Sequence, residues 1–254
     1  MSGDRRGITL ALVALVAGCT TDPIYLGPDP DFVWWTDHES GDLSDWERHG
    51  THWTNGGGEL EIVGDPARSG NHAVRATVVP SPSGTLSAAI LVVEDVPATA
   101  YSSAWFYVFE PVATADFWVF FKLGARTDAE DAQTEVEVWD FNREPRGAGL
   151  GIRAVPRLGQ TIDALTAHEI AVGRWFHVEA YLRASDSDDG ELRLWLDEML
   201  VLNYDGPTSP SNYVTWTVGG ATEGLASGTA ALVIDDAAVT TRRLGRAFPP
   251  FWRP

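Results

Sequence analysis

The chain is poor in cysteine and lysine, and each shortage excludes a class of protein. Cys19 is the only cysteine among 254 residues, so no intramolecular disulfide can form. Lys122 is the only lysine, and Lys and Arg together number 18 against 36 Asp and Glu, which gives a formal net charge of -18. An acidic chain without basic runs is a poor partner for nucleic acid or anionic lipid headgroups. We therefore expect no nucleic-acid ligand.

A long apolar run occurs only at the N-terminus. Arg5 and Arg6 precede residues 8–17, which are apolar except for Thr9, and small residues then lead to Cys19. A run this short cannot span a bilayer, and its basic flank is typical of a signal peptide. The string VAGC, which ends at Cys19, resembles the lipobox of bacterial lipoproteins. This resemblance implies that the thiol of Cys19 is acylated.

The rest of the chain divides into a short tether and one domain. Residues 1–19 are expected to form the signal peptide with its lipidated cysteine, 20–31 an extended tether with three prolines, and 32–254 one domain. Thr20 follows the cysteine, which resembles the pattern of lipoproteins sorted to the outer membrane. We expect an exported protein held at the bacterial membrane, in the outer membrane, by its lipid.

Short strand-like runs make up the domain, and no helical stripe is evident after Cys19. The runs are rich in Val, Ile, Leu, Thr and aromatic residues, and they end at Gly, Pro, Asp or Asn. Such runs at regular spacing predict two packed antiparallel sheets of roughly seven strands each. The expected strands begin near Phe32, Trp46, Glu59, Ala73, Thr85, Ser103, Phe117, Glu135, Gly149, His168, Phe176, Glu191, Met199, Val214 and Ala230.

Alternation within these runs indicates which positions face the core. Aliphatic residues occupy every second position, and the positions between them mix acids, arginines and aromatics. The Asp197–Glu198 pair separates two such runs and is expected to form a tight hairpin turn. The positions expected to face the core are Phe176, Val178, Ala180, Leu182, Leu192, Leu194, Leu196, Val136 and Val138.

Four stretches resemble landmarks of concanavalin A-like jelly-roll domains, in the laminin G-like and polysaccharide lyase-like groups that include heparin lyase I-like proteins. They are WWTDHESGDLSDW, GDPARSGNHAVRATV, GRWFHVEAYLRASDSDDGELRLWLDEMLV and ALVIDDAAVTTRRLG. The landmarks span residues 34–245. This resemblance implies an all-β, two-sheet antiparallel jelly-roll sandwich. It implies less about activity, because one architecture hosts many functions.

The chain departs from the lyases at the strand that should neutralise the substrate. Alginate lyase-like members carry an Arg/Glu-rich strand, whereas the comparable stretch here, GTLSAAILVVEDV, is apolar and contains no arginine. Cleavage of uronates requires positive charge where the substrate carboxylate sits. The departure favours binding over cleavage.

Two arrangements are nevertheless candidates for catalysis. Glu135, Glu137 and Asp140 have the spacing of the laminarinase-like E-x-D-x-x-E motif, with the middle and last residue types exchanged. Retaining hydrolysis needs two carboxyls about 5 to 5.5 Å apart, and residues five apart share a strand face only across a bulge. His177 and Tyr181 are a candidate lyase acid/base pair, although they lie about 13 Å apart along one strand. A solvated strand face is the expected alternative at both places.

Aromatic and charged side chains on the outward positions could bind a carbohydrate. Aromatic rings stack on the apolar face of a sugar, and charged groups supply hydrogen bonds to its hydroxyls. Packing beneath loops is an equally good interpretation of the same positions. The predicted carbohydrate-binding residues are Trp139, Tyr181, Trp195, Glu135, Glu137, Arg183 and Arg193.

A structural calcium ion is the one cofactor that the resemblance suggests. In this fold the first and last strands often pair, and related modules hold calcium there. Glu39, Asp235 and Asp236 would supply the carboxylates that calcium prefers. The alternative is that they are unrelated polar residues at strand ends.

Three functions remain open at this point. The leading hypothesis is a lipoprotein whose jelly roll binds a glycan without catalysis. The second is an enzyme, either a polysaccharide lyase or a glycoside hydrolase. The third is a structural or adhesive protein of the cell envelope.

Overall fold

The described part of the domain contains fifteen strands, and their positions follow the apolar alternation of the sequence. The computed structural model describes residues 31–82, 85–110, 118–126, 133–142, 148–157, 160–165, 172–208, 213–225 and 228–247. These residues belong to one compact unit, Pro30–Arg253. The predicted signal peptide, Cys19 and residues 20–30 of the predicted tether lie outside the described residues. In the described part of the chain, no helix is long and apolar enough to span a membrane.

The larger sheet has eight strands and contains both the first and the last strand. Its order is β13 (Met199–Asp205), β12 (Glu191–Leu196), β11 (Trp175–Arg183), β6 (Thr99–Val108), β15 (Ala230–Thr240), β4 (Ala73–Val78) and β3 (Glu59–Val63), and β1 (Phe32–Thr36) also pairs with β15. The pairing of β1 with β15 confirms the expected contact between the ends of the domain.

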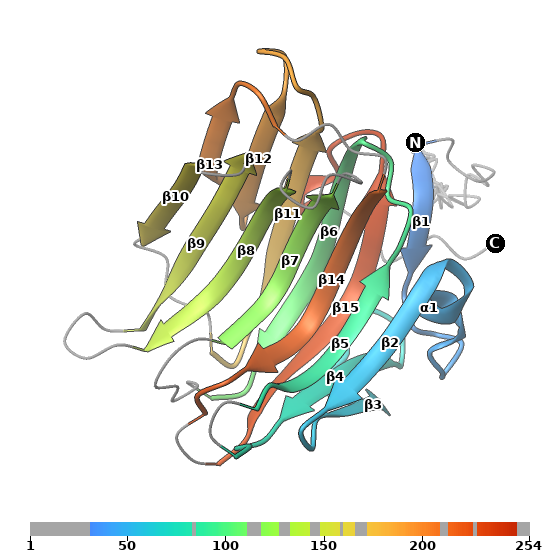
Figure 1. The fold of residues 1–254 in the computed structure, drawn as a ribbon. Helices are drawn as coiled ribbons and strands as arrows, with labels where there is room; N and C mark the ends of the chain where they lie inside the picture. Colours follow the sequence, from blue (N-terminus) through green and yellow to red (C-terminus); the bar gives the residue numbers. More distant parts are fainter. Residues whose placement is uncertain are drawn as a thin grey trace, which may run out of the picture. The chain divides into compact units, whose positions relative to one another are not determined.

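The second sheet has seven strands and packs face to face against the first (Figure 1). Its order is β10 (Gln160–Leu165), β9 (Ala148–Arg157), β8 (Gln133–Asn142), β7 (Trp118–Arg126), β14 (Tyr213–Thr222), β5 (Ser87–Val93) and β2 (Gly50–Asn55). The strand pairs described in both sheets are antiparallel. The chain is therefore the all-β two-sheet sandwich that its sequence predicts.

The core between the sheets holds the alternate aliphatic positions. Phe176, Val178, Ala180 and Leu182 on β11 are buried, as are the three leucines of β12. On β8 the register aligns Val136 with buried Leu123 and Val138 with buried Phe121. Four tryptophans complete this core: Trp34, Trp46, Trp118 and Trp216.

The β12–β13 hairpin confirms the predicted turn. Asp197 and Glu198 form its two-residue loop, and both have positive φ angles, of 47° and 75°. Positive φ at both central residues defines the type I′ turn, whose twist matches that of a hairpin.

Two predicted elements differ in the structure. The run near Trp46 begins as a short helix, α1 (Ser44–His49), and only then continues as β2. Asp45 and Glu47 lie in its first turn and Arg48 and His49 in its last, which suits the helix dipole. The completely buried Trp46 anchors α1 to the core. Strand β10 was not predicted, and the strand expected near His168 lies outside the described residues.

Candidate functional site

The predicted carbohydrate-binding residues lie in two different sheets. Tyr181 and Arg183 are on β11, and Arg193 and Trp195 are on β12, all in the eight-stranded sheet. The other three, Glu135, Glu137 and Trp139, are on β8 in the seven-stranded sheet (Figure 1). Both groups occupy positions that alternate with core residues, so their faces lie on opposite sides of the sandwich. The seven residues therefore cannot all belong to one binding site.

On the outer face of the eight-stranded sheet, aromatic side chains cross from strand to strand. Tyr181 is in register with Tyr101 of β6, and their ring centroids are 4.6 Å apart. Trp195 of β12 follows at 6.2 Å from Tyr101. All three rings are half-buried. Sequence reasoning missed Tyr101, although its alternation with buried Ala100 could have indicated it.

The arginines of this face already form ion pairs with carboxylates of the same sheet. Arg183 pairs with Glu191 at 2.6 Å, and Arg193 pairs with Asp205 and, at 3.5 Å, with Glu191. The guanidinium of Arg243 lies 4.4 Å from the centre of the Trp195 ring. Because the ring and both arginines have partners, internal contacts fill this face.

The C-terminal segment 241–247 is held across this face by a buried carboxylate. Glu179 on β11 accepts hydrogen bonds from the backbone N–H of Leu244 at 2.8 Å and of Gly245 at 3.3 Å. Its other oxygen pairs with Nε of Arg243 at 3.0 Å. Burial raises the pKa of Glu179, and these donors act in the opposite direction. Glu198 adds a second anchor by pairing with Arg243 at 2.8 Å.

His177 lies under this segment and is unsuited to proton transfer. Its side chain is 1 % exposed, and its ring centroid is 5.0 Å from that of Trp105. Burial, reinforced by the charges of Arg68, Arg246 and Arg243, lowers the pKa of His177 to about 3. The imidazole is therefore neutral and shielded at neutral pH.

Tyr181, the other member of the predicted lyase pair, is equally poorly placed. Burial raises the pKa of Tyr181, so its phenol keeps its proton. Tyr181 is four residues from His177 on the same strand, which corresponds to about 13 Å. The prediction of His177 and Tyr181 as an acid/base pair is wrong, because one member is buried and the other is too distant.

The carboxylates predicted to bind calcium accept hydrogen bonds instead. Glu39 accepts from the backbone N–H of Asn71 and of His72. Asp235 accepts from the backbone N–H of Arg68 at 2.8 Å and of Ser69 at 3.2 Å.

Asp236 pairs with the Arg68 guanidinium and accepts from the hydroxyl of Ser69. Across the described ranges, no group of three or more acidic, histidine or cysteine side chains could hold a metal ion. The predicted calcium site formed by Glu39, Asp235 and Asp236 is therefore wrong.

Asp235 instead belongs to a buried hydrogen-bonded chain. Trp46 donates its indole N–H to Nε2 of His38 at 3.1 Å, so the proton of neutral His38 is on Nδ1. Nδ1 of His38 lies 3.5 Å from Asp235. All three side chains are inaccessible to solvent. These hydrogen bonds connect α1 to β15, which gives the polar residues a structural role.

The outer face of the seven-stranded sheet carries a row of polar residues that crosses five strands. The backbone register aligns Thr217 of β14 with Lys122 of β7, Lys122 with Glu137 of β8, Glu137 with Arg153 of β9, and Arg153 with Asp163 of β10. We call these five positions the polar row. Thr217, Lys122 and Arg153 are half-buried and alternate with core residues.

The lone lysine of the chain therefore stands in the middle of a sheet, beside Glu137. Sequence reasoning missed Lys122, Arg153 and Thr217, because register between strands cannot be read from one strand at a time. The side chains of Glu135, Glu137, Trp139, Asp140 and Asp163 lie outside the described residues, and only the backbone positions of these residues are described.

The register of β8 also shows whether the residues of the predicted hydrolase motif share one face of the sheet. Glu135 to Asn142 pair with β9 one for one, without a bulge. Positions 135 and 140 therefore alternate to opposite faces, and Asp140 is in register with the buried Trp118. The one shift between β7 and β8 lies on β7, between Val119 and Phe121. The backbone therefore lacks the bulge that would bring positions 135 and 140 to one face, and the hydrolase motif of Glu135, Glu137 and Asp140, whose side chains lie outside the described residues, stays a prediction.

Comparison with known proteins identifies the fold. No protein-family model and no curated protein sequence matches the chain. Solved structures do match, at low sequence identity. The endo-β-1,4-glucuronan lyase of the fungus Trichoderma reesei is 15 % identical, with a TM-score of 0.63 over 83 % of this chain and 96 % of that one.

Two further solved structures match the fold at low sequence identity. A marine alginate lyase from Aplysia kurodai is 7 % identical, with a TM-score of 0.58 over 83 % of this chain and 99 % of that one. A cellulose-induced protein is 16 % identical, with a TM-score of 0.55 over 83 % of this chain and 98 % of that one. The chain thus has a jelly-roll fold like that of polysaccharide lyases.

Proposed function

We propose that this domain binds a neutral polysaccharide on the outer face of its seven-stranded sheet and does not cleave it. The observation that carries the proposal is the polar row. Neighbouring strands lie about 4.8 Å apart, so five strands present one polar position each along about 19 Å. A row of this length can contact several consecutive sugar rings with hydrogen-bonding groups. Position 139, a tryptophan on β8, adjoins the row and can supply a stacking surface.

The charges of the polar row favour a neutral ligand. Lys122 and Arg153 are balanced by Glu137 and Asp163, so the row has no net charge. The whole chain carries a net charge of -18, which repels a polyanion at long range. Charged donors and acceptors alternating along the row suit sugar hydroxyls, which both donate and accept.

The positions of the predicted catalytic groups support binding over cleavage. His177 is buried on the opposite side of the sandwich, and the acidic motif on β8 is divided between two faces. Within the described residues, no histidine belongs to the polar row. The fold neighbours are named as glucuronan and alginate lyases, which supports a polysaccharide as the ligand class.

A binding experiment with two matched variants tests the proposal. The full chain is screened against immobilised neutral and uronic polysaccharides, with unsaturated-uronate absorbance and reducing-sugar release measured in parallel. We expect binding to a neutral polymer and no turnover. Lys122→Met should weaken that binding about tenfold or more, since a hydrogen bond to a charged group contributes about 1.5 to 3 kcal/mol.

Arg75→Met is the control, because it removes a cation from the outer face of the opposite sheet, where Arg75 pairs with Glu61. Equal loss in both variants would contradict the proposed face. Turnover of any polymer would replace the binding proposal with the enzyme alternative. Absence of both binding and turnover would leave the structural or adhesive alternative.

We also propose that Cys19 anchors the protein to the bacterial outer membrane as a lipoprotein. The VAGC string, the basic start and the short apolar run support this. Several acyl chains give the stable anchoring that one chain does not. Labelling of cells with a fatty-acid probe should mark the protein, and Cys19→Ser should abolish the label. A Cys19→Ser protein that is still labelled would contradict the proposal.

A further inference from the structure

Trp53 lies on β2, the edge strand of the sheet that carries the polar row. Among the tryptophans whose side chains the structure describes, Trp53 alone is exposed, at 42 %. Trp34 and Trp195 pack against other rings, whereas the Trp53 indole has no ring contact and no hydrogen bond within the described residues. A single exposed apolar side chain is ordinary in itself, so the position of Trp53 on the sheet decides what it can bind.

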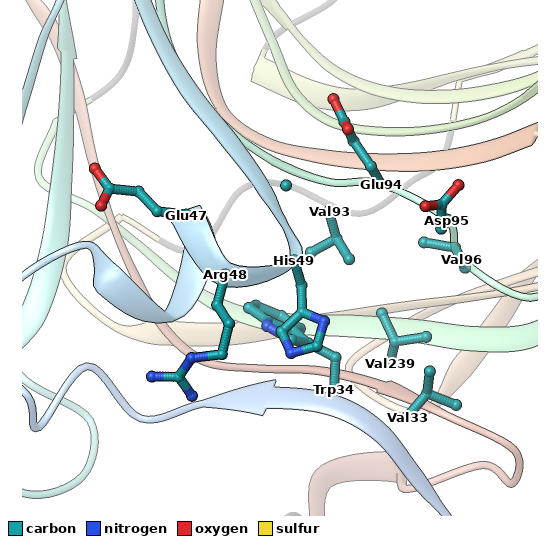
Figure 2. A pocket seen from close by; sticks show the side chains of 11 residues that line it. Val33, Trp34, Glu47, Arg48, His49, Val93, Glu94, Asp95, Val96 and Val239 are labelled. Carbon is teal, nitrogen blue, oxygen red and sulfur yellow. The ribbon is translucent and has the colours of Figure 1, made fainter.

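The Trp53 side chain is on the outer side of the sheet. Helix α1 closes the inner side, since its Trp46 belongs to the core. Figure 2 shows the pocket of about 380 Å³ where α1 leads into β2, with Glu47 and His49 in its lining. His52 points to this inner side, because its Nδ1 lies 3.5 Å from Glu47. Alternation along β2 therefore turns Trp53 to the outer face.

The register continues the polar row across two more strands to the edge beside Trp53. Thr217 of β14 aligns with Val92 of β5, and Val92 aligns with Thr51 of β2. Thr51 is exposed and precedes Trp53 by two residues, so both side chains lie on one face. Three strand spacings separate β2 from Lys122 of β7, a distance of about 14 Å. A ligand that fills the polar row can thus continue directly to Trp53.

The surface between Trp53 and the polar row carries one apolar side chain and one glycine. Trp53 aligns with Ile90 of β5, and Ile90 aligns with Gly219 of β14. Ile90 is half-buried, so part of its side chain is accessible. Gly219 has a φ of 128°, and a Cβ atom there would lie 2.2 Å from the carbonyl oxygen of Ala89. Because no side chain can stand at position 219, that residue does not block the path from Trp53 to Lys122.

We propose that Trp53 is a stacking subsite at the edge of the polysaccharide-binding face, and that it takes an extended, β-linked chain of pyranose rings with equatorial hydroxyls. An aromatic ring stacks on a sugar face that presents C–H groups, and axial hydroxyls interrupt such a face. Equatorial hydroxyls project from the edge of the ring, where the polar row can bind them. A β-linked chain of such rings is extended, as is the line of aligned positions from β10 to β2, whereas an α-linked glucan coils. This inference rests on the proposed function, because both concern the same face.

Titration calorimetry of the full chain with two hexasaccharides of glucose tests the ligand class. Cellohexaose is β-linked and extended, and maltohexaose is α-linked and coiled. We expect cellohexaose to bind about tenfold more tightly, because only the extended chain can contact Trp53 and the polar row together. In a parallel NMR titration, cellohexaose should shift the indole N–H signal of Trp53, which is identified by its absence in Trp53→Ala.

Two variants and a control locate the stacking contact. Trp53→Ala should weaken cellohexaose binding about threefold to tenfold, the range measured for aromatic stacking. Trp53→Tyr keeps an aromatic ring and should restore most of the affinity. Thr54→Ala changes the next residue of β2, which is also exposed but alternates to the inner side, and should leave the affinity unchanged. Urea unfolding of the three variants shows that each is folded.

The outcomes distinguish this inference from the function on which it rests. Binding of cellohexaose that Lys122→Met weakens and Trp53→Ala does not would overturn the stacking subsite and keep the polar row. Equal affinity for cellohexaose and maltohexaose would overturn the ligand class. Failure of both hexasaccharides and of every neutral polymer to bind would overturn the proposed function and this inference together.

Discussion

Replacing Arg243 by methionine should destabilise the protein by leaving a buried carboxylate short of one partner. Glu179 is 0 % exposed, and Arg243 neutralises it through the Nε contact at 3.0 Å. Methionine keeps the aliphatic length of the side chain but cannot donate. Glu179 would then keep only its backbone donors, Leu244 and Gly245.

The size of the effect follows from burial on each side of the pair. Breaking a fully buried ion pair costs about 3 to 5 kcal/mol. The Arg243 side chain is 35 % exposed, so water can reach part of the vacated space. We therefore expect a loss of about 2 kcal/mol in the free energy of unfolding. For a domain of this size, that corresponds to a fall in Tm of about 4 to 8 °C.

A double-mutant cycle separates this explanation from lost packing. Glu179→Gln retains an oxygen for the two backbone donors and carries no charge. In the Glu179→Gln background, Arg243→Met should lower the free energy of unfolding by only about 0.5 kcal/mol. The coupling energy between Glu179 and Arg243 is then about 1.5 kcal/mol. Urea unfolding measures all four proteins, and amide exchange of 244–245 reports on the segment itself. An equal loss of unfolding free energy from Arg243→Met in both backgrounds would show that the ion pair with Glu179 is not the cause.

Two further predictions concern the core and the buried histidine. Leu194→Ala should cost about 2 to 5 kcal/mol in urea unfolding, because Leu194 is 0 % exposed, whereas Leu200→Ala, at a 46 % exposed position, should cost about 0.5 kcal/mol or less. Similar costs for both would contradict the assigned core. The pKa of His177 is lowered from 6.5 to about 3, so the unfolded state binds more protons between these values. Stability should fall as pH drops through that window, by up to about 1.4 kcal/mol per pH unit. His177→Phe should lose this contribution, and an unchanged pH profile would show that His177 does not titrate as described.

The strands could be predicted because the alternation of apolar and polar residues within each strand shows which of its faces is buried. Alternation along β11 and β12 marks one face as core without reference to any other strand. The turn at Asp197–Glu198 could be predicted as well, because it depends only on residues adjacent in the sequence. The short helix α1 was missed, since its six residues are too few to show a helical period, and the buried Trp46 stabilises it through tertiary packing.

The candidate site could not be predicted, because it depends on which strands are neighbours. Glu179 alternates with core residues and looked solvent-exposed, but the C-terminal segment covers it. His177 was misjudged for the same reason. Lys122 and Arg153 lie far apart in the sequence, and only the register of β7, β8 and β9 brings them into one row. Burial by a distant segment and register between strands are both non-local, so a single strand cannot reveal them.

Amide hydrogen exchange with bound polysaccharide shows whether the ligand lies on the polar row. The full chain is compared with and without a saturating neutral polysaccharide. The proposal predicts added protection in peptides from β7, β8 and β9, with β11 and β12 unchanged. Protection confined to β11 and β12, around Tyr181 and Trp195, would contradict it and assign the ligand to the opposite face.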